Sequence, residues 1–341
     1  MTAALVTDTR YAAHTLAGHV EFAGRMIAIH ELLNAHGLPE KMTRITPAEV
    51  DGDLLRRVHR AKYLDLLAWT ETQKGIQLGP DTYVLPQSFS VARLSAGSAV
   101  AAVDAVLGAK FHAALSCARP PGHHATREIG MGFCLLSNIA LAARHAQRAH
   151  GMKRIMIVDY DVHHGNGTQD VFYEDPDVLF VSTHQSPWYP GTGMITETGT
   201  GAGTGTTVNI PVPAGTGDAG FAQIYEQIVW PVARRFKPEL ILVSAGFDAH
   251  WDDPLGQLKL GLKGYDYLAR QLMAIADELC DGKIVFALEG GYNLTALSHG
   301  VLNLAYALTG DTRLIDPLGE AKGPETDIQH VVEEVIKLHN L

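Results

Sequence analysis

Short apolar runs alternate with helical patterns along most of this chain, and this alternation is what most restricts the folds open to it. Apolar runs typical of buried strands occupy residues 113–117, 154–158, 178–182, 240–243 and 284–288. Helical patterns occupy residues 21–36, 47–58, 91–107, 137–150, 221–236, 265–279 and 294–308. Thr46-Pro-Ala-Glu49 has the form of a capping box at the start of the second of these helices. Apolar strands separated by helices predict an α/β fold with a mostly parallel sheet flanked by helices on both faces.

Polar residues follow several of the predicted strands. In parallel sheets, ligands bind beyond the carboxyl ends of the strands. The residues that fall at those ends are His123, Asp161, His184, Asp248 and Tyr292. We therefore expect an active site at that edge of the sheet.

Asp161 and His163 form the outline of a metal site. They lie two residues apart after the run 155–158, so on an extended segment their side chains leave the same face. The segment after the run 240–243 offers Asp248 and His250 as a third ligand, and we favour Asp248. Two carboxylates and one imidazole leave a position open for water, as a hydrolase requires. The competing interpretation is that each Asp only caps a helix or closes a turn.

Two further segments carry groups suited to proton transfer and oxyanion binding. In Arg119-Pro-Pro-Gly-His123-His124, the prolines fix the backbone before two adjacent imidazoles. A His-His pair alone is more often structural than catalytic. In Leu288-Glu-Gly-Gly-Tyr292, paired glycines let a tyrosine sit close to a ligand, where its hydroxyl can donate to an oxyanion.

Six segments together resemble the zinc-dependent histone deacetylase superfamily, most closely its class II branch and the bacterial deacetylase-like amidohydrolases. They are RPPGHHA, GFCLLSNIA, VDYDVHHGNGTQDVFY, HQSPWYPGTG, SAGFDAHWDDPLG and LEGGYN, in the family's order between about His19 and Asn303. The resemblance implies an arginase/deacetylase-like fold in one deacetylase domain over residues 1–341. Its catalytic motifs would span about 113–303, and a helical segment would end the chain at about 325–341.

The resemblance also implies a role for each matching residue. It implies Asp161, His163 and Asp248 as zinc ligands, His124 as general base and acid, His123 as its electrostatic partner, and Tyr292 as the group that polarises the carbonyl. A structural potassium ion would be held by Asp159, Ser182 and the backbone of Asp161, His163 and Thr183. Asn166 would orient a histidine, and His164 would not be a ligand. The substrate tunnel would be formed by Phe133, Tyr189, Gly132, Leu255 and Asp81, although a turn-forming role suits Asp81 equally well.

Other segments bear on the mouth of the pocket. His19 and Glu21 resemble a loop near that mouth. Leu255 is apolar where polyamine-specific relatives can carry a glutamate, and the insertion after Trp69 found in acetylpolyamine amidohydrolases is absent. Residues 189–220 are rich in glycine and threonine but lack the spacing of a phosphate loop, so we expect a turned loop near the pocket.

Composition limits the partners and the compartment. The net charge is -10 and we identify no basic run, which argues against nucleic acid as a partner. Cys117, Cys134 and Cys280 are isolated, as is typical of thiols in a reducing cytosol. The N-terminus lacks a signal-peptide pattern, and no run of 18 apolar residues occurs, so a cytoplasmic protein outside the membrane is expected.

The predicted function is zinc-dependent hydrolysis of the amide of acetyl-lysine or related acyl-lysine in proteins or peptides. The alternative within the family is an acetylpolyamine amidohydrolase acting on a small acetylated amine. An arginase-type dinuclear manganese enzyme would need a second set of carboxylates, for which Asp252 and Asp253 are the nearby residues. A silent acyl-lysine binder would not need the full set of ligands and Tyr292. The ligand set also accepts Fe²⁺, and the oligomeric state is left open.

Overall fold

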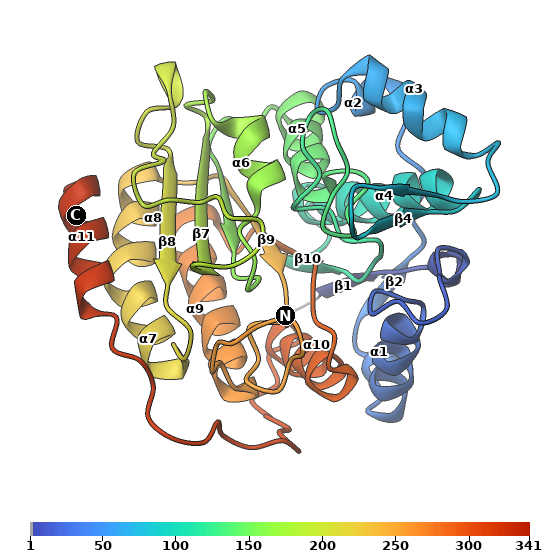
Figure 1. Cartoon of the computed structure of the whole chain (residues 1–341). Coiled ribbons are helices and arrows are strands. Elements are labelled where there is room, and N and C mark those ends of the chain that lie inside the picture. Colours follow the sequence, from blue (N-terminus) through green and yellow to red (C-terminus); the bar gives the residue numbers. More distant parts are fainter. Residues whose placement is uncertain (1–2) are drawn as a thin grey trace.

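The computed structural model describes residues 3–341 and contains one large sheet between two layers of helices (Figure 1). The eight-stranded sheet has the order β2-β1-β5-β10-β9-β6-β7-β8, and its strand pairings are parallel. Its strands are β1 (Ala3–Val6), β2 (Thr43–Ile45), β5 (Ala113–Ser116), β6 (Ile155–Asp159), β7 (Val178–Gln185), β8 (Thr207–Val212), β9 (Leu240–Ala245) and β10 (Ile284–Leu288). A separate antiparallel hairpin is formed by β3 (Ile76–Leu78) and β4 (Thr82–Val84). The predicted α/β fold is confirmed.

Helices cover both faces of the sheet. One layer contains α2 (Gly52–Leu55), α3 (Ala61–Thr70), α4 (Ser88–Leu107), α5 (Asn138–His150) and α6 (Asn166–Phe172). The other contains α1 (Gly24–Ala35), α7 (Asp218–Ile224), α8 (Trp230–Phe236), α9 (Leu262–Cys280), α10 (Leu294–Leu308) and α11 (Gln329–His339). A π-helical turn, Tyr225–Val229, joins α7 to α8.

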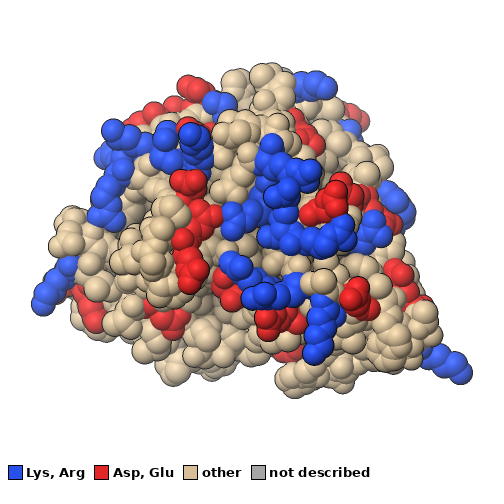
Figure 2. All heavy atoms as spheres, turned by 90° about the horizontal axis from the view of Figure 1, so that it is seen from above, with Lys and Arg blue, Asp and Glu red and all other residues tan. Residues whose placement is uncertain are grey.

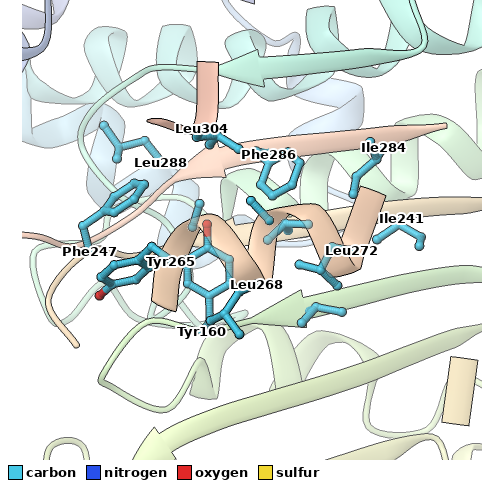
Figure 3. Packing of buried hydrophobic residues seen from close by; sticks show 14 of the residues in the cluster. Tyr160, Ile241, Phe247, Tyr265, Leu268, Leu272, Ile284, Phe286, Leu288 and Leu304 are labelled. Atoms are coloured by element: carbon cyan, nitrogen blue, oxygen red, sulfur yellow. The ribbon is translucent and has the colours of Figure 1, made fainter. Parts of the chain in front are cut away.

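Each strand serves two hydrophobic cores, one on each face of the sheet. Successive side chains of a strand point to opposite faces. In β10, Ile284 and Phe286 join the core beneath α9 and α10, while Val285 and Ala287 join the core beneath α4 and α5. Figure 3 shows the first core, where side chains of α9 pack onto β9 and β10. Burial on both faces explains why the strands are apolar runs without alternation.

The predicted helix over 47–58 is largely wrong. Only α2 is helical in this range, and the side chain of Asp51 caps it by accepting a hydrogen bond from the backbone N–H of Leu54. The residues before it lie directly against α4, where a Cβ at Gly97 would come 1.7 Å from the carbonyl oxygen of Ala48. This packing overrides the local capping-box pattern of Thr46.

The glycine-rich segment 189–220 contains a strand as well as turns. β8 forms the edge of the large sheet beside β7, with Phe180 opposite Thr207. Pro211 is tolerated there because an edge strand needs hydrogen bonds on one side only. The prediction of a loop throughout this segment is therefore corrected, and β1 and β2 were also not predicted.

One helix, α4, is both long and mostly apolar. Within residues 3–341 it is long and apolar enough to cross a membrane by length and composition, and 67% of that stretch is buried inside the domain. It packs on β1, β5 and β10 and lies beside α5. These contacts account for its apolar composition.

Candidate active site

Three residues predicted as metal ligands converge where β6 and β9 end. Nδ1 of His163 lies 3.0 Å from Oδ1 of Asp161 and 3.3 Å from Oδ2 of Asp248. The ligand atoms of the three residues all lie within 4.8 Å of one another. Because β6 and β9 are parallel neighbours in the sheet, their carboxyl ends bring the two segments together.

The environment of this centre fits a cation. Asp161 and Asp248 are fully buried, and Oδ2 of Asp248 has no hydrogen-bond partner among the described residues. Burial tends to lower the pKa of His163, but the two carboxylates outweigh it and raise that pKa to about 10. A field that stabilises an imidazolium between two carboxylates also favours a bound metal ion. Gly290 leaves room for it, since a Cβ there would come 1.9 Å from Oδ2 of Asp248.

The two histidines after β5 lie beside this centre, and each has its own partner. Nδ1 of His123 is 3.0 Å from Oδ2 of Asp159, and Nδ1 of His124 is 2.7 Å from Oδ1 of Asn166. Burial tends to lower the pKa of His123, but the charges of Asp161 and Asp159 raise it well above its usual value. Burial and the neighbouring charge of His123 hold the pKa of His124 well below its usual value. These directions favour a neutral His124 beside a charged His123.

Tyr292 faces the same pocket from the loop after β10. The loop is fixed by Asp253, whose carboxylate accepts the backbone N–H of Tyr292 at 2.7 Å and that of Asn293 at 3.0 Å. The guanidinium of Arg25 lies 5.1 Å from the centre of the Tyr292 ring. Burial raises the pKa of Tyr292 well above its usual value, so its hydroxyl stays protonated and can donate a hydrogen bond.

A single cavity of about 260 Å³ leads from the surface to these groups. Its lining consists of Asp81, His124, Gly132, Phe133, His163, Trp188, Tyr189, Pro254, Leu255 and Tyr292. All five residues predicted for the substrate tunnel thus border it. The ring of Tyr189 lies 5.2 Å from that of His124, and the ring of Phe133 lies 5.7 Å from that of Tyr292.

Backbone close to the pocket explains two of its residues. Gly132 has a φ of 53°, and a Cβ there would come 2.2 Å from the His124 ring. Its N–H donates to Asp81 at 3.2 Å, and the hydroxyl of Thr82 donates to the same carboxylate oxygen at 2.7 Å. Asp81 therefore lines the pocket and also fixes the backbone of Gly132 in the pocket wall.

The residues predicted for a potassium site lie in register on adjacent strands. Asp159 of β6 pairs with Ser182 of β7. Oδ1 of Asp159 accepts the backbone N–H of Asp161 at 3.1 Å, and Oγ of Ser182 lies 3.0 Å from Nδ1 of His184. Asp159 thus links the strand to both the His123 ring and the metal centre.

Several other candidates lie outside the pocket. His184 lies near the carboxyl end of β7 as expected, but its ring is buried and bonded to the Gly193 carbonyl and does not line the pocket. His164 binds Thr192 and Gln169. Nδ1 of His250 accepts the backbone N–H of Asp252, and the carboxylates of Asp252 and Asp253 bind Asn293 and backbone N–H groups. A second set of bridging carboxylates is not present among the described residues, which argues against the dinuclear manganese alternative.

Glu289, which was not predicted from the sequence, supports the loop that carries the two histidines. Its fully buried carboxylate accepts the backbone N–H of Gly122 at 2.6 Å and that of His123 at 3.1 Å. The hydroxyl of Ser244 donates to its other oxygen at 3.1 Å. Glu289 thereby joins the ends of β9 and β10 to the histidines. Its position directly after the apolar strand β10 is the sequence feature that could have identified it as a residue of the site.

A buried ion network lies behind the pocket. Glu21 was predicted near the mouth, but it is fully buried and binds Arg119 through both carboxylate oxygens and Arg25 through one at 3.3 Å. Arg25 also donates to the carbonyl oxygens of Gly291 at 2.7 Å and Glu289 at 2.6 Å. His19 remains near the mouth, with its ring 4.8 Å from that of Phe133.

Replacing Glu21 by Gln is expected to lower the free energy of unfolding by about 3–5 kcal/mol, because it leaves two buried arginines short of a counter-charge. Burial tends to raise the pKa of Glu21, but Arg119 outweighs it and lowers that pKa from 4.5 to about 2. The stabilisation is thus complete above pH 4.5 and is lost as the pH falls toward 2. Urea unfolding at pH 7 and at low pH measures both effects. Equal stability of the two proteins at pH 7 would contradict the assignment.

The fold and the site together are those of a class of hydrolases that have a parallel sheet between helices and a candidate metal site beyond the carboxyl ends of the strands. The sequence profile described as "Histone deacetylase domain" matches residues 19–308. The chain therefore belongs to the histone deacetylase family.

Individual relatives agree with this placement. "Histone deacetylase 14, chloroplastic" of Arabidopsis thaliana is 50% identical over 69% of this chain and 57% of its own length. A "Probable deacetylase" of Methanothermobacter thermautotrophicus is 40% identical over 95% of both chains. The crystal structure of the HDA15 HD domain has a TM-score of 0.89 at 33% identity, covering 99% of this chain and 93% of that one. The chain spans 57% of the length of that Arabidopsis thaliana protein and 61% of the length of "Histone deacetylase 10, chloroplastic" of Oryza sativa subsp. japonica.

Proposed function

We propose that the protein is a zinc-dependent deacetylase that hydrolyses the amide of acetyl-lysine or a related acyl-lysine in peptides or proteins. The observation that carries this proposal is a single pocket bordered by Phe133 and Tyr189 that reaches both His124 and His163. Its aromatic rim suits the apolar stem of an acylated lysine, and its inner end holds groups for proton transfer beside a metal centre.

Asp161, His163 and Asp248 would hold the ion, and their two carboxylates and one imidazole are suited to zinc or iron. A metal ion bound there supplies Lewis acidity toward a carbonyl oxygen and toward water. Asp159 and Ser182 would contribute to a separate potassium site, supported by their adjacent positions in register.

The protein's own groups then divide the remaining work. Neutral His124 takes the proton of the attacking water at its Nε2, because its Nδ1 is engaged by Asn166. It returns a proton to the leaving amine. His123, held by Asp159, places a positive charge beside the developing negative charge. The Tyr292 hydroxyl donates a hydrogen bond to the oxyanion formed from the substrate carbonyl.

Hydrolysis of acetylpolyamines is the second candidate, favoured by one relative. "Polyamine deacetylase HDAC10" of Mus musculus is 38% identical over 86% of this chain. A polyamine carries cationic amines, which a pocket binds best with carboxylates at its rim. Here the rim presents apolar Leu255 and Pro254, and its carboxylate, Asp81, already accepts two hydrogen bonds from the protein. These residues support acyl-lysine as the substrate.

Chelation followed by zinc addition is expected to abolish and then restore turnover of an acetyl-lysine peptide. The same assay with N-acetylputrescine compares the two candidate substrates, and we expect kcat/KM to favour the peptide. Preference for N-acetylputrescine would transfer the function to the second candidate. Turnover that is unaffected by chelator would contradict a metal-dependent mechanism for both.

A further inference from the structure

We infer that the protein carries a second metal site, on its surface, formed by Asp104 of α4 with His145 and His150 of α5. Nε2 of His145 lies 2.6 Å from Oδ1 of Asp104, and Nε2 of His150 lies 2.7 Å from the same oxygen. The ligand atoms of the three residues lie within 4.8 Å of one another. Two imidazoles and a carboxylate from two helices thus converge on one point.

The donor set suits a divalent transition metal such as zinc. Imidazole nitrogen and carboxylate oxygen are zinc ligands, and three of them leave room for water. The side chain of Asp104 is 50% exposed and those of the histidines 21% and 24%, so solvent and ions reach the cluster. The Nε2 atoms that lie next to Asp104 are the ring nitrogens that would face a bound ion, and each ring could then carry its proton on Nδ1.

The ends of both helices reinforce the attraction for a cation. Asp104 lies in the last turn of α4, which ends at Leu107, and His150 is the last residue of α5. The C-terminal end of a helix carries a partial negative charge that favours cations nearby. Since α4 and α5 pack side by side (Figure 1), two such ends meet at this cluster.

The cluster is separate from the catalytic centre. α5 ends at His150 shortly before β6 begins at Ile155, whereas Asp161 follows the carboxyl end of β6. The surface cluster therefore lies toward the amino-terminal edge of the sheet, at the opposite edge from the pocket. Figure 2 shows the molecule from above the view of Figure 1, and on the face seen there acidic side chains are interspersed with Lys and Arg side chains. An ion bound here would cross-link α4 and α5 without contacting the substrate.

Metal-free protein titrated with zinc chloride tests this site. We expect about two zinc ions per chain in the wild type and about one in His145→Ala/His150→Ala, which keeps its deacetylase activity. Asp248→Ala, which disrupts the catalytic centre, should also bind about one. Its thermal midpoint should still rise on zinc addition, because a ligand that binds only the folded state stabilises it.

The matched control is His299→Ala/His330→Ala, which removes two histidines elsewhere on the surface and should retain about two ions. The inference is overturned if the wild type binds one ion and the thermal midpoint of Asp248→Ala does not respond to zinc. Equal loss of zinc in the control pair would also overturn it, since binding would then be distributed over surface histidines. Because the second site is measured in Asp248→Ala, its outcome does not depend on whether the catalytic proposal holds.

Discussion

Replacing His124 by Ala is expected to lower kcat by roughly two to four orders of magnitude while the protein keeps its metal. The variant loses the imidazole that we propose as the proton acceptor, which lines the pocket and is bonded to Asn166. His124 is not one of the three candidate metal ligands, which are Asp161, His163 and Asp248, so its removal should leave the metal bound. Metal content by mass spectrometry and single-turnover kinetics together measure the two parts of this prediction.

Asn166→Ala is the graded control for His124. The substitution leaves the His124 imidazole in place but removes the oxygen that lies 2.7 Å from its Nδ1. The ring is then held less firmly in its orientation, and the pH profile of kcat should shift. We expect a smaller loss of activity than in His124→Ala. If His124→Ala loses the metal together with its activity, His124 is a ligand and its assignment as the base is wrong.

Tyr292→Phe is expected to slow the chemical step by about two to three orders of magnitude and to leave folding intact. The hydroxyl makes no hydrogen bond to another described residue, so its removal leaves no buried group unpaired, while the ring keeps its contacts with Phe133 and Arg25. Because the donor acts on charge that develops in the transition state, kcat should fall and KM should change little.

Tyr189→Phe is the matched control, because it removes the same hydroxyl from another wall of the same pocket. Its ring lies beside His124 and His163, so the wall stays aromatic. We expect kcat within about threefold of the wild type, in line with loss of an ordinary hydrogen-bonding group. Equal activity of Tyr292→Phe and Tyr189→Phe would show that Tyr292 is not the oxyanion donor.

The sequence by itself determined the class of fold and the candidate residues of the site. The runs that became β5, β6, β7, β9 and β10 were identifiable because strands buried on both faces are continuously apolar. Asp161, Asp248 and Tyr292 could be predicted to lie near one another because parallel strands end at one edge of the sheet and these residues follow those ends, whereas the residues that line the pocket were predicted from the family resemblance.

Only the tertiary structure decided which polar residues share a site. Glu21 was predicted near the mouth of the pocket. It is instead buried in an ion pair with Arg119, which lies 98 positions away in the sequence. His184 has the same strand-end signal as the pocket residues, but its ring is bonded within β7 and to Gly193.

The pairing of Asp104 with His145 and His150 likewise depends on the packing of α4 against α5. Local periodicity and spacing report which way a side chain leaves its own element. Which charges and ligands meet depends on contacts between elements far apart in the chain, and those contacts exist only once the sheet and its helices have assembled.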